Sequence, residues 1–478
     1  MKDLRIHKFR RLYDRSSGKF TVDIRYSTRA DITPRTIGVA EAFGLGIDEA
    51  KLHVIYDNAE FQISQSDIVC ITGESGSGKS VLLRAFEKDL GDEALNIDSL
   101  TVDPDKPLIE TVGKDLNEAL ELLSRVGLND AYLFLRKYRE LSDGQRYRYR
   151  IAKLIESEKQ FWVMDEFCAT LDRETAKIVA FNVQKQARRT GKAVIVATTH
   201  IDLLKNLTPS VHIHKGWGKR LEVNYYPNQI NAVCSVTKDL RIEEGSMRDY
   251  EALAEFHYRN VTAHPAPIKI FALRRNDEEL VGVIVYSYPP PQIFGRREAI
   301  GKTLSIHELN RELASISRVI LHPKYRSIGL GAHLVQETLP LCGRRYVETM
   351  AVMAQYNPFF EKAGMKRIAE RKPDKSIIQA IKSLEDLGFK SYLLSSQQAN
   401  INKLETMSDV EVRKVYEILL KISTVYYKRL RSTSDIFLKK DDFRKWLKKA
   451  SNEVLAKVLS RLAVLAETKI YLFWENCS

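Results

Sequence analysis

The stretch Ile68–Ser80 constrains this chain of 478 residues more than any other. A β-branched run over 68–72 ends in the glycine-rich turn 73–80, and the residues after it have the pattern of a helix. The turn has the form G-x-x-x-x-G-K-[ST], in which glycines let consecutive backbone N–H groups face a phosphate at a helix N-terminus. The sequence therefore predicts an α/β domain with a site for a nucleoside triphosphate.

Each position of this turn has an expected role in nucleotide binding. Lys79 is expected to reach the β- and γ-phosphates, and the Ser80 hydroxyl to ligate Mg²⁺. The other predicted cofactor-binding residues of the turn are Gly73, Glu74, Ser75, Gly76, Ser77 and Gly78. An aromatic that stacks on the base is expected upstream; Phe43 and Tyr56 are the candidates, with core packing as the alternative for each.

Further motifs follow downstream of the turn. The segment Leu141–Gln145 precedes a predicted helix, and the apolar residues 161–164 are typical of a buried strand that ends in Asp165 and Glu166. We expect Asp165 to hold Mg²⁺ through water and Glu166 to polarise the attacking water. A second apolar strand ends at His200, which we expect beside the γ-phosphate at the same sheet edge.

This order of motifs resembles an ABC-type ATPase domain over about residues 35–228. The resemblance implies that Ser142 and Gly144, with Gln145 beside them, complete the ATP site of a second copy of the chain. It also identifies Asp172 as the end of the D-loop. Because one chain carries one P-loop and one signature, two chains are expected to close on two ATP molecules as a homodimer.

Two features depart from the ABC pattern. No Gln occurs between residues 81 and 140, where such domains usually carry one that touches Mg²⁺; Asp103 and Asp105 are the candidate substitutes. The interval from the P-loop to the signature is also short, which predicts a reduced helical arm. Together with the absence of a membrane span, this disfavours a transporter role, and no transmembrane partner is expected.

A second phosphate-binding turn, Arg326-x-x-Gly329-x-Gly331, follows a strand predicted over 314–321. It places a cation, glycines and free amides at a helix N-terminus. With the segment 356–365, it resembles the GNAT N-acetyltransferase fold over residues 238–370, in which this turn holds the pyrophosphate of acetyl-CoA. The residues that the resemblance assigns to acetyl-CoA, or a related acyl-CoA, are Ile320, Leu321, Arg326, Ser327, Ile328, Gly329, Leu330 and Gly331.

The sequence departs from the GNAT pattern at the positions of the general base and the general acid. Many GNAT enzymes place a Glu base on the strand that here carries Ser315, Ser317 and Arg318, and a Tyr general acid where this chain has Phe360. We therefore expect transfer to rely on positioning and on strand amides that hold the thioester carbonyl. The candidate proton carriers are Tyr356, Asn357, His322 and Ser317.

The positive charge of the chain is concentrated in its C-terminal half. Residues 301–450 contain 28 Lys and Arg against 16 Asp and Glu, which accounts for +12 of the net charge of +13. This predicts a polyanionic partner, nucleic acid first, with a solvated helical surface as the alternative. The loop 286–297 combines tyrosines, prolines and arginines, which suits an unstacked base, although a plain exposed loop is the alternative.

The motifs divide the chain into four parts. We expect a strand-rich N-terminal extension over 1–34, the ABC-type domain over 35–230, the GNAT-like α+β domain over 231–375 and a basic helical module over 376–478. The helix, turn, helix, strand order of the last part is that of a winged helix, and a dimerisation or docking module is the alternative. The lack of an apolar run of ~18 residues, of a signal peptide and of paired cysteines predicts a cytoplasmic protein.

The whole arrangement resembles a family of archaeal and phage proteins in which an ABC-type ATPase is fused to a GNAT domain. The hypothesis is an ATP-hydrolysing ATPase coupled to an acetyl-CoA-dependent N-acetyltransferase that modifies a nucleobase in tRNA or DNA. One alternative is an ATP-gated protein acetyltransferase acting on lysine or an N-terminus. The other is a non-catalytic nucleic-acid clamp in which the GNAT fold is inert.

Overall fold

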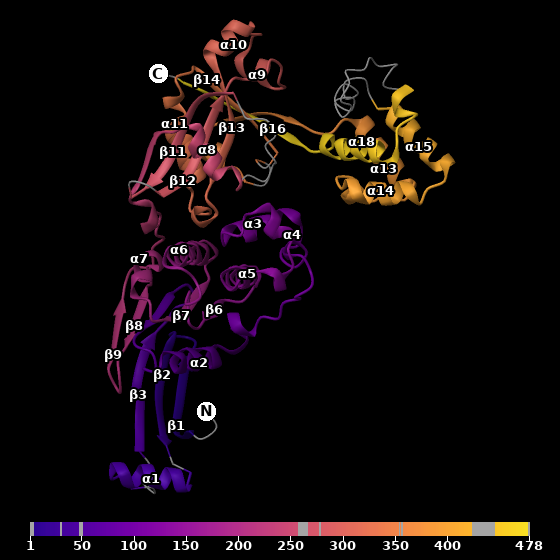
Figure 1. Cartoon of the computed structure of the whole chain (residues 1–478). Coiled ribbons are helices and arrows are strands. Elements are labelled where there is room, and N and C mark those ends of the chain that lie inside the picture. The colour runs from indigo at the N-terminus through magenta and orange to yellow at the C-terminus, as the bar shows by residue number, and fades with distance from the viewer. Residues whose placement is uncertain are drawn as a thin grey trace. The chain divides into compact units, whose positions relative to one another are not determined.

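The computed structural model describes residues 4–28, 31–46, 51–256, 266–276, 279–352, 354, 357–422 and 445–476 (Figure 1). The chain forms two compact units. Unit 1 consists of Met1–Val285 and Arg318–Thr338, and unit 2 of Tyr286–Ser317 and Leu339–Ser478. Tyr356 and the basic residues Lys439, Lys440 and Arg444 lie outside the described residues.

A six-stranded sheet in the order β5-β6-β7-β4-β8-β9 forms the centre of unit 1. Its strands are β4 (Ile68–Thr72), β5 (Ala94–Asn96), β6 (Phe161–Met164), β7 (Ala193–Thr198), β8 (Val211–Lys215) and β9 (Leu221–Tyr225). β4, β7 and β6 are parallel, with Thr72 opposite Thr198 and Met164 opposite Val196. Their carboxyl ends therefore meet at one edge, as the sequence predicts.

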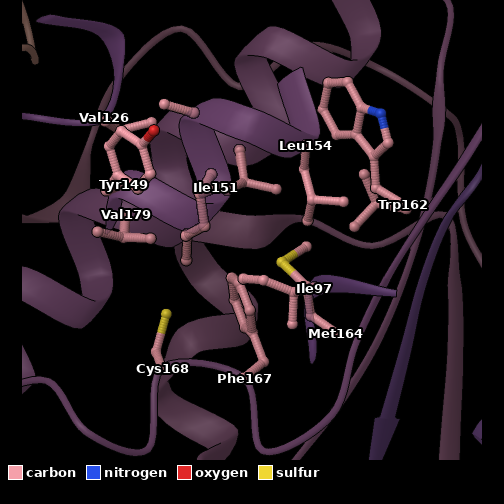
Figure 2. Packing of buried hydrophobic residues seen from close by; sticks show 14 of the residues in the cluster. Ile97, Val126, Tyr149, Ile151, Leu154, Trp162, Met164, Phe167, Cys168 and Val179 are labelled. Carbon is pink, nitrogen blue, oxygen red and sulfur yellow. The ribbon is translucent and has the colours of Figure 1, made fainter. Parts of the chain in front are cut away.

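The two faces of this sheet bury different cores, because successive strand residues point to opposite sides. Ile68 and Cys70 pack into the core that includes α3 (Leu116–Arg125), α5 (Asp143–Glu156) and α6 (Arg173–Thr190). Figure 2 shows Tyr149, Leu154 and Trp162 within this core. Val69 and Ile71 pack into the core that includes α2 (Lys79–Leu90) and the N-terminal strands. The shorter helices α4 (Ala131–Leu135) and α7 (Leu204–Leu207) complete this part.

An antiparallel sheet of β1 (Leu4–Asp14), β2 (Lys19–Thr28) and β3 (Lys51–Gln62) covers the α2 face. Phe20 and Phe61 from this sheet contact the edge of the Phe86 ring on α2, with ring centroids 4.9 and 5.3 Å apart. The helix α1 (Pro34–Phe43) lies between β2 and β3 in the sequence. The first strands of the chain thus form part of the scaffold beneath the P-loop helix.

Unit 1 also holds β10, β11, most of β12 and the end of β13, which follow one another in that order in the acyltransferase-like sheet. The elements are β10 (Leu240–Glu244), α8 (Met247–Ala254), β11 (Pro267–Arg275), β12 (Glu279–Ser287), β13 (Leu313–Leu321) and α11 (Leu330–Thr338). Tyr250 and Leu253 of α8 pack on Val283, Val285 and Ile320. This core fixes the end of β13, from which the second phosphate-binding turn leaves.

Unit 2 contains the order β13-β14-β16-β15 and a helical module. Its elements after β13 are β14 (Tyr346–Ala351), α12 (Phe359–Lys362), β15 (Lys366–Arg371), α13 (Lys375–Asp386), α14 (Gln397–Glu405), α15 (Asp409–Leu420), α18 (Asn452–Leu465) and β16 (Lys469–Glu475). The helices α9 (Arg296–Ile300) and α10 (Ile306–Glu312) precede β13. No helix within the described ranges combines the length and the apolar character needed to cross a bilayer.

The last strand contradicts the winged-helix alternative for the C-terminal module. β16 pairs antiparallel with β14 on one side and with β15 on the other, so it is an internal strand of the acyltransferase-like sheet. A winged helix would need this strand in a hairpin beside its own helices. The helices α13, α14, α15 and α18 instead bury a core of their own, which includes Leu384, Leu404 and Leu459.

Candidate active sites

The P-loop backbone has the curvature that a phosphate cradle requires. Gly73, Gly76 and Gly78 have φ angles of 143°, 77° and 108°, values that side chains disfavour. A Cβ on Gly73 would lie 2.0 Å from the carbonyl oxygen of Lys215. Glycine at this position is therefore a steric necessity.

The polar groups of the turn are available for a ligand. Among the described residues, the backbone N–H groups of Gly76, Gly78 and Lys79 donate no hydrogen bond, and Ser77 Oγ is buried without a partner. Lys79 Nζ donates to the carbonyls of Gly73 and Glu74 at 2.9 and 2.7 Å, so it is held over the turn. This donor set fits the phosphates of a nucleoside triphosphate.

Asp165 and Glu166 follow directly on β6 and carry their carboxylates toward the P-loop. Glu166 has φ 47° and donates its backbone N–H to Asp165 Oδ1 at 3.0 Å. Burial lowers the pKa of Lys79, and the charges of Asp165 and Glu166 oppose that shift, which indicates that both carboxylates lie near its ammonium. Asp165 and Ser80 are the residues that could hold Mg²⁺ beside the phosphates, because a carboxylate and a hydroxyl supply the oxygen ligands that Mg²⁺ prefers.

His200 lies just beyond β7, the strand between β6 and β4. Thr198 Oγ1 accepts the His200 N–H at 3.1 Å and donates to the Phe167 carbonyl at 3.1 Å, which ties the two strand ends together. Burial, and then the charge of Arg173, lower the pKa of His200. Its imidazole is therefore neutral at pH 7 and can both donate and accept a hydrogen bond.

The signature residues begin α5 in a capping box. Ser142 donates its N–H to Gln145 Oε1 at 3.1 Å, and Gln145 donates its N–H to Ser142 Oγ at 3.4 Å. A Cβ on Gly144 would lie 3.0 Å from the Leu171 side chain, so the signature and the D-loop are closely packed. Asp172 caps α6 by accepting the Thr175 N–H at 3.1 Å.

The structure also describes the candidates for stacking on the base, Tyr56 and Phe43, and the candidates for replacing the missing Gln, Asp103 and Asp105. Tyr56 is 1% exposed and donates to the Gly78 carbonyl at 3.1 Å, so its core-packing alternative is confirmed, whereas Phe43 is 75% exposed on α1. Asp103 and Asp105 form surface ion pairs with Lys106 and Arg139.

Trp217 is an aromatic neighbour of the P-loop that sequence reasoning missed. Its indole N–H donates to the Glu74 carboxylate, its ring lies 3.3 Å from where a Cβ on Gly76 would be, and it is 60% exposed. The residue sits in the turn between β8 and β9, about 140 positions after the P-loop. Only the order of the strands in the sheet brings it there, so no local pattern could have identified it.

The second phosphate-binding turn leaves β13 and opens α11. The backbone N–H groups from Ser327 to Gly331 donate no hydrogen bond within the described part of the chain, so they are free for an anion. The Arg326 guanidinium donates to the carbonyls of Leu321, Phe256 and Asn129 at 2.9, 3.0 and 3.2 Å. Burial lowers the pKa of Arg326, and Ile320 is buried beneath the turn.

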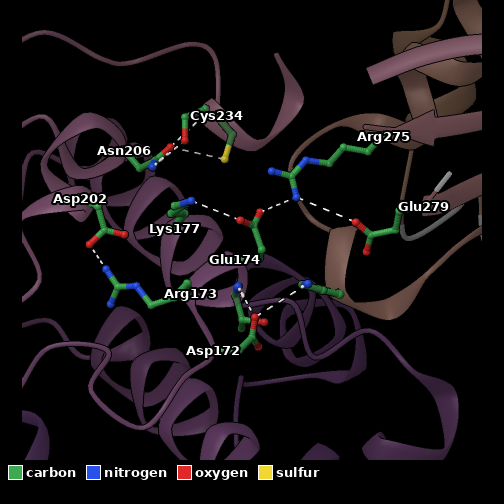
Figure 3. Close-up of polar contacts among 12 residues, drawn as sticks. Asp172, Arg173, Glu174, Lys177, Asp202, Asn206, Cys234, Arg275 and Glu279 are labelled. Carbon is green, nitrogen blue, oxygen red and sulfur yellow. Dashed lines mark hydrogen bonds and ion pairs between the residues drawn. The ribbon is translucent and has the colours of Figure 1, made fainter. Parts of the chain in front are cut away.

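Unit 1 contains direct bonds between this turn and the ATPase part. Asn182 on α6 donates to Ser327 Oγ at 2.8 Å, and Lys324 lies 4.0 Å from the D-loop carboxylate of Asp172. Nearby, Arg275 at the end of β11 pairs with Glu174 on α6 at 2.8 Å (Figure 3). The acyltransferase-like part of unit 1 is therefore bonded to α6 and the D-loop of the ATPase part.

The proton-carrier candidates are only partly described. Asn357 is exposed, and Ser317 Oγ lies 2.7 Å from Ser287 Oγ, both in unit 2. In unit 1, burial lowers the pKa of His322, which packs edge-on against Phe256. No single base emerges from these positions.

A carboxylate that sequence reasoning missed lies beside β13 in unit 2. Glu348 on β14 is opposite Ser315, is fully buried, and accepts from Arg296 at 2.7 and 3.0 Å and from the Tyr471 hydroxyl at 2.8 Å. Arg296 also donates to the carbonyls of Pro290 and Pro291. The carboxylate is thus occupied in fixing the proline-rich loop, and Tyr471 reaches it only because β16 returns to the sheet.

Comparison with known proteins separates the two parts of the chain. The model of the acetyltransferase (GNAT) family matches residues 232–365. The cytochrome c biogenesis ATP-binding export protein CcmA of Chelativorans sp. (strain BNC1) is 30% identical over 177 residues, which cover 31% of this chain and 85% of that protein. CcmA of Reclinomonas americana is 28% identical over 179 residues, covering 31% and 80%.

Among solved structures, the chain is similar to a dimeric ATP-binding cassette in a post-hydrolysis state bound to ADP and phosphate. The match has a TM-score of 0.30 and 21% identity, and covers 36% of this chain and 91% of that one.

Proposed function

The chain belongs to the family of ATP-binding cassette ATPases and carries a GNAT acetyltransferase region, and from this premise we propose that it couples ATP binding and hydrolysis to acyl transfer from acetyl-CoA onto a nucleobase amine in tRNA or DNA. The coupling rests on one observation: within unit 1, the second phosphate-binding turn is bonded to the ATPase part through the Asn182–Ser327 hydrogen bond and the bond from Arg326 to the Asn129 carbonyl.

The ATPase part acts as a homodimer in this proposal. Lys79 and the P-loop amides bind the phosphates, Ser80 and Asp165 hold Mg²⁺, and Glu166 polarises the attacking water while neutral His200 contacts the γ-phosphate. Ser142 and Gly144 act on the ATP of the second copy. One P-loop and one signature per chain favour this arrangement, because the P-loop of one chain needs the signature of a second chain to complete its ATP site.

In the acyltransferase part, the free amides of the turn 327–331 bind the pyrophosphate of acetyl-CoA or a related acyl-CoA. The acceptor amine attacks the thioester carbonyl, the N–C bond forms and the C–S bond breaks, and the amine proton leaves as the thiolate departs. Strand amides orient the carbonyl. Tyr356, Asn357, His322 and Ser317 remain the candidate proton carriers.

The nucleic-acid substrate is supported by the charge of +12 over residues 301–450. In the loop 286–297, Tyr288 is half exposed and Arg297 is exposed, whereas Tyr286 and Arg296 are buried. Tyr288 is therefore available to stack on an unpaired base, and Arg297 to contact its phosphate. The charge and the exposed aromatic are what favour a nucleic acid over a protein acceptor.

Mass spectrometry of nucleosides tests the acceptor. We expect tRNA or DNA from cells with the gene to contain an acylated nucleoside that is absent from cells without it. In vitro, labelled acetyl-CoA should label nucleic acid, and binding should weaken steeply with salt because phosphate contacts release counterions. Label on protein alone would contradict the nucleobase proposal and favour the lysine or N-terminal acetyltransferase.

A second candidate is a clamp in which the GNAT fold binds but does not transfer. The absence of a Glu on β13 and the full engagement of Glu348 favour it. Calorimetry with acetyl-CoA separates the two: the enzyme must bind it, and binding must depend on the turn 327–331. If acetyl-CoA does not bind, the clamp is the better explanation.

A further inference from the structure

The loop 286–297 of unit 2 contains a segment that cannot be held by its own backbone N–H groups. Pro289, Pro290 and Pro291 have no N–H group, so this proline segment cannot donate hydrogen bonds to a neighbouring strand. Its carbonyls can accept, and the Arg296 guanidinium donates to those of Pro290 and Pro291 at 2.7 and 3.1 Å. The segment is therefore held by a side chain from the far end of the same loop.

The Arg296 guanidinium is itself fixed by buried groups. It donates to both oxygens of Glu348 at 3.0 and 2.7 Å, and the Tyr471 hydroxyl donates to the same carboxylate at 2.8 Å. The side chains of Arg296 and Glu348 are 9% and 0% exposed. Burial and the nearby carboxylate raise the pKa of Tyr471, so its hydroxyl stays a donor. The planar guanidinium thus joins a carboxylate on β14 to two carbonyls of the loop.

Two further contacts hold the ends of the loop on the strands. Gly295 has a φ of 83°, and a Cβ there would lie 2.6 Å from the Tyr471 ring, so the backbone packs directly against that ring. At the other end, Ser287 Oγ lies 2.7 Å from Ser317 Oγ, which joins the end of β12 to β13. Tyr288 lies between these fixed points and is 50% exposed. The loop is therefore anchored at both ends, while its aromatic side chain faces solvent.

Stability alone does not explain a buried ion pair at this place. Removing two charges from water costs about as much as their attraction contributes, and apolar side chains of similar size often stabilise a fold as well or better. Apolar side chains, however, offer no donors to the carbonyls of the proline segment. The pair therefore supplies a defined loop conformation, and a loop that is already ordered loses less conformational freedom when it binds a ligand.

We propose that Arg296 is a positioning residue that sets the conformation of the loop 286–297, so that Tyr288 stacks on an unpaired acceptor base. This rests on the nucleic-acid substrate of the proposed function. Glu348 and Tyr471 orient the guanidinium, and the guanidinium orients the proline segment that follows Tyr288. Because an aromatic ring stacks only on a base whose face is open, the loop selects single-stranded or extruded bases over bases in a duplex.

The test is binding of the full-length chain to short single strands of DNA and RNA that carry 2-aminopurine, a base whose fluorescence changes on stacking. Tyr288→Ala should abolish the fluorescence change and weaken binding about tenfold, which is within the range for stacking one base on an aromatic. Tyr288→Phe should preserve both. Arg296→Lys keeps the charge but loses the planar group, and should match Tyr288→Ala.

Two comparisons show whether Arg296 acts through the loop. Combining Arg296→Lys with Tyr288→Ala should weaken binding no further than either substitution alone, because both remove the same stacking contact. Arg311→Lys is the matched control, since Arg311 is an exposed arginine of α10 whose ion pair with Glu312 lies outside the loop. It should leave the fluorescence change and the affinity as they are in the parent chain.

A triple variant separates positioning from folding. Arg296→Met, Glu348→Leu and Tyr471→Phe together replace the buried polar groups by apolar side chains of similar size. This chain should unfold cooperatively near the temperature of the parent, yet show no fluorescence change that depends on Tyr288. A folded triple variant that keeps the change would overturn the proposal. If the triple variant does not fold, Arg296→Lys decides, and parent-like binding and fluorescence in that variant would overturn the proposal equally.

The remaining outcomes distinguish this inference from the function on which it rests. An equal fluorescence change with the matching duplexes would overturn the selection of unpaired bases. Binding of the single strands by the parent chain without a change that depends on Tyr288 would overturn the inference, but it would leave the nucleic-acid substrate intact. If the single strands do not bind at moderate salt, the nucleic-acid substrate of the proposed function fails, and this inference fails with it.

Discussion

The two phosphate-binding turns of unit 1 use their cations in different ways. In the P-loop, Lys79 Nζ bends back onto the carbonyls of Gly73 and Glu74, which belong to the turn itself. In the second turn, Arg326 bonds instead to carbonyls outside the turn, which include that of Asn129 in the ATPase part. The first cation is positioned for a ligand, and the second fastens one part of the unit to another.

The difference shows that the cationic residues of two similar glycine-rich turns, Lys79 and Arg326, can have different roles. A lysine ammonium is a compact charge on a flexible stem, suited to following a phosphate. A guanidinium presents several N–H donors at once, suited to satisfying several carbonyls. In the second turn, anion binding is therefore left to the backbone amides.

The largest effect is expected at Glu166, the carboxylate after β6 that we propose to polarise the attacking water beside the P-loop. Glu166→Gln should lower ATP hydrolysis by about 10²–10⁴-fold, because the amide cannot polarise the attacking water. ATP binding should persist and trap the proposed dimer, measured by light scattering with saturating ATP. A monomer under these conditions would contradict the composite-site argument, and Lys79→Ala, which should neither bind ATP nor dimerise, is the control.

Glycine substitutions distinguish the two turns sterically. Gly73→Ala should abolish ATP binding and cost more than ~3 kcal/mol of unfolding free energy, because its Cβ would lie 2.0 Å from the Lys215 carbonyl. Gly329→Ala has no atom within 4 Å of its Cβ and should cost only the strain of a φ of 92°, about 1–2 kcal/mol. Chemical denaturation of both variants measures the difference, and equal costs would refute it.

Removing the cationic side chains Arg326 and Lys79 is expected to give the next largest difference, in stability and in ATP binding. Arg326→Ala should destabilise the chain by about 1–3 kcal/mol, because it removes the donor to the part-buried carbonyls of Leu321, Phe256 and Asn129. Lys79→Ala should remove ATP binding yet change stability by less than about 0.5 kcal/mol. Thermal unfolding without nucleotide measures both. If the Arg326→Ala chain is as stable as the parent and has lost only its affinity for CoA, Arg326 binds the ligand and does not hold the parts of unit 1 together.

Much of this arrangement was predictable from the sequence, because the residues suited to nucleotide chemistry follow directly on recognisable strands. The P-loop, Asp165, Glu166 and His200 follow apolar strands whose parallel pairing brings their ends to one edge, as the pattern of the sequence predicted. The GNAT region was predictable from its turn and the strand before it, and the family model over residues 232–365 confirms it.

The remaining features depend on contacts that no local pattern contains. Trp217 reaches the P-loop through the strand order of the sheet, and Tyr471 reaches Glu348 because the last strand returns to pair with β14. Arg326 has the spacing of a ligand-binding arginine, yet its partners Asn129 and Phe256 lie far away in sequence. Long-range packing decided these roles.

Half-buried histidines beside the two turns give the smallest expected effect, a dependence of stability on pH. Burial lowers the pKa of His212, which shares a hydrogen bond of 2.8 Å with Thr72 before the P-loop, and the charge of His214 lowers it further. Burial also lowers the pKa of His322 before the second turn. Since the unfolded chain then binds more protons than the folded chain at low pH, this contribution to the free energy of unfolding is present above the ordinary pKa of 6.5 and is lost as the pH falls below it.

Chemical denaturation at pH 7.5 and 5.5 should show a smaller loss of unfolding free energy in His212→Gln and in His322→Gln than in the parent chain. An unchanged loss in both variants would mean that other groups set the pH dependence around the two turns.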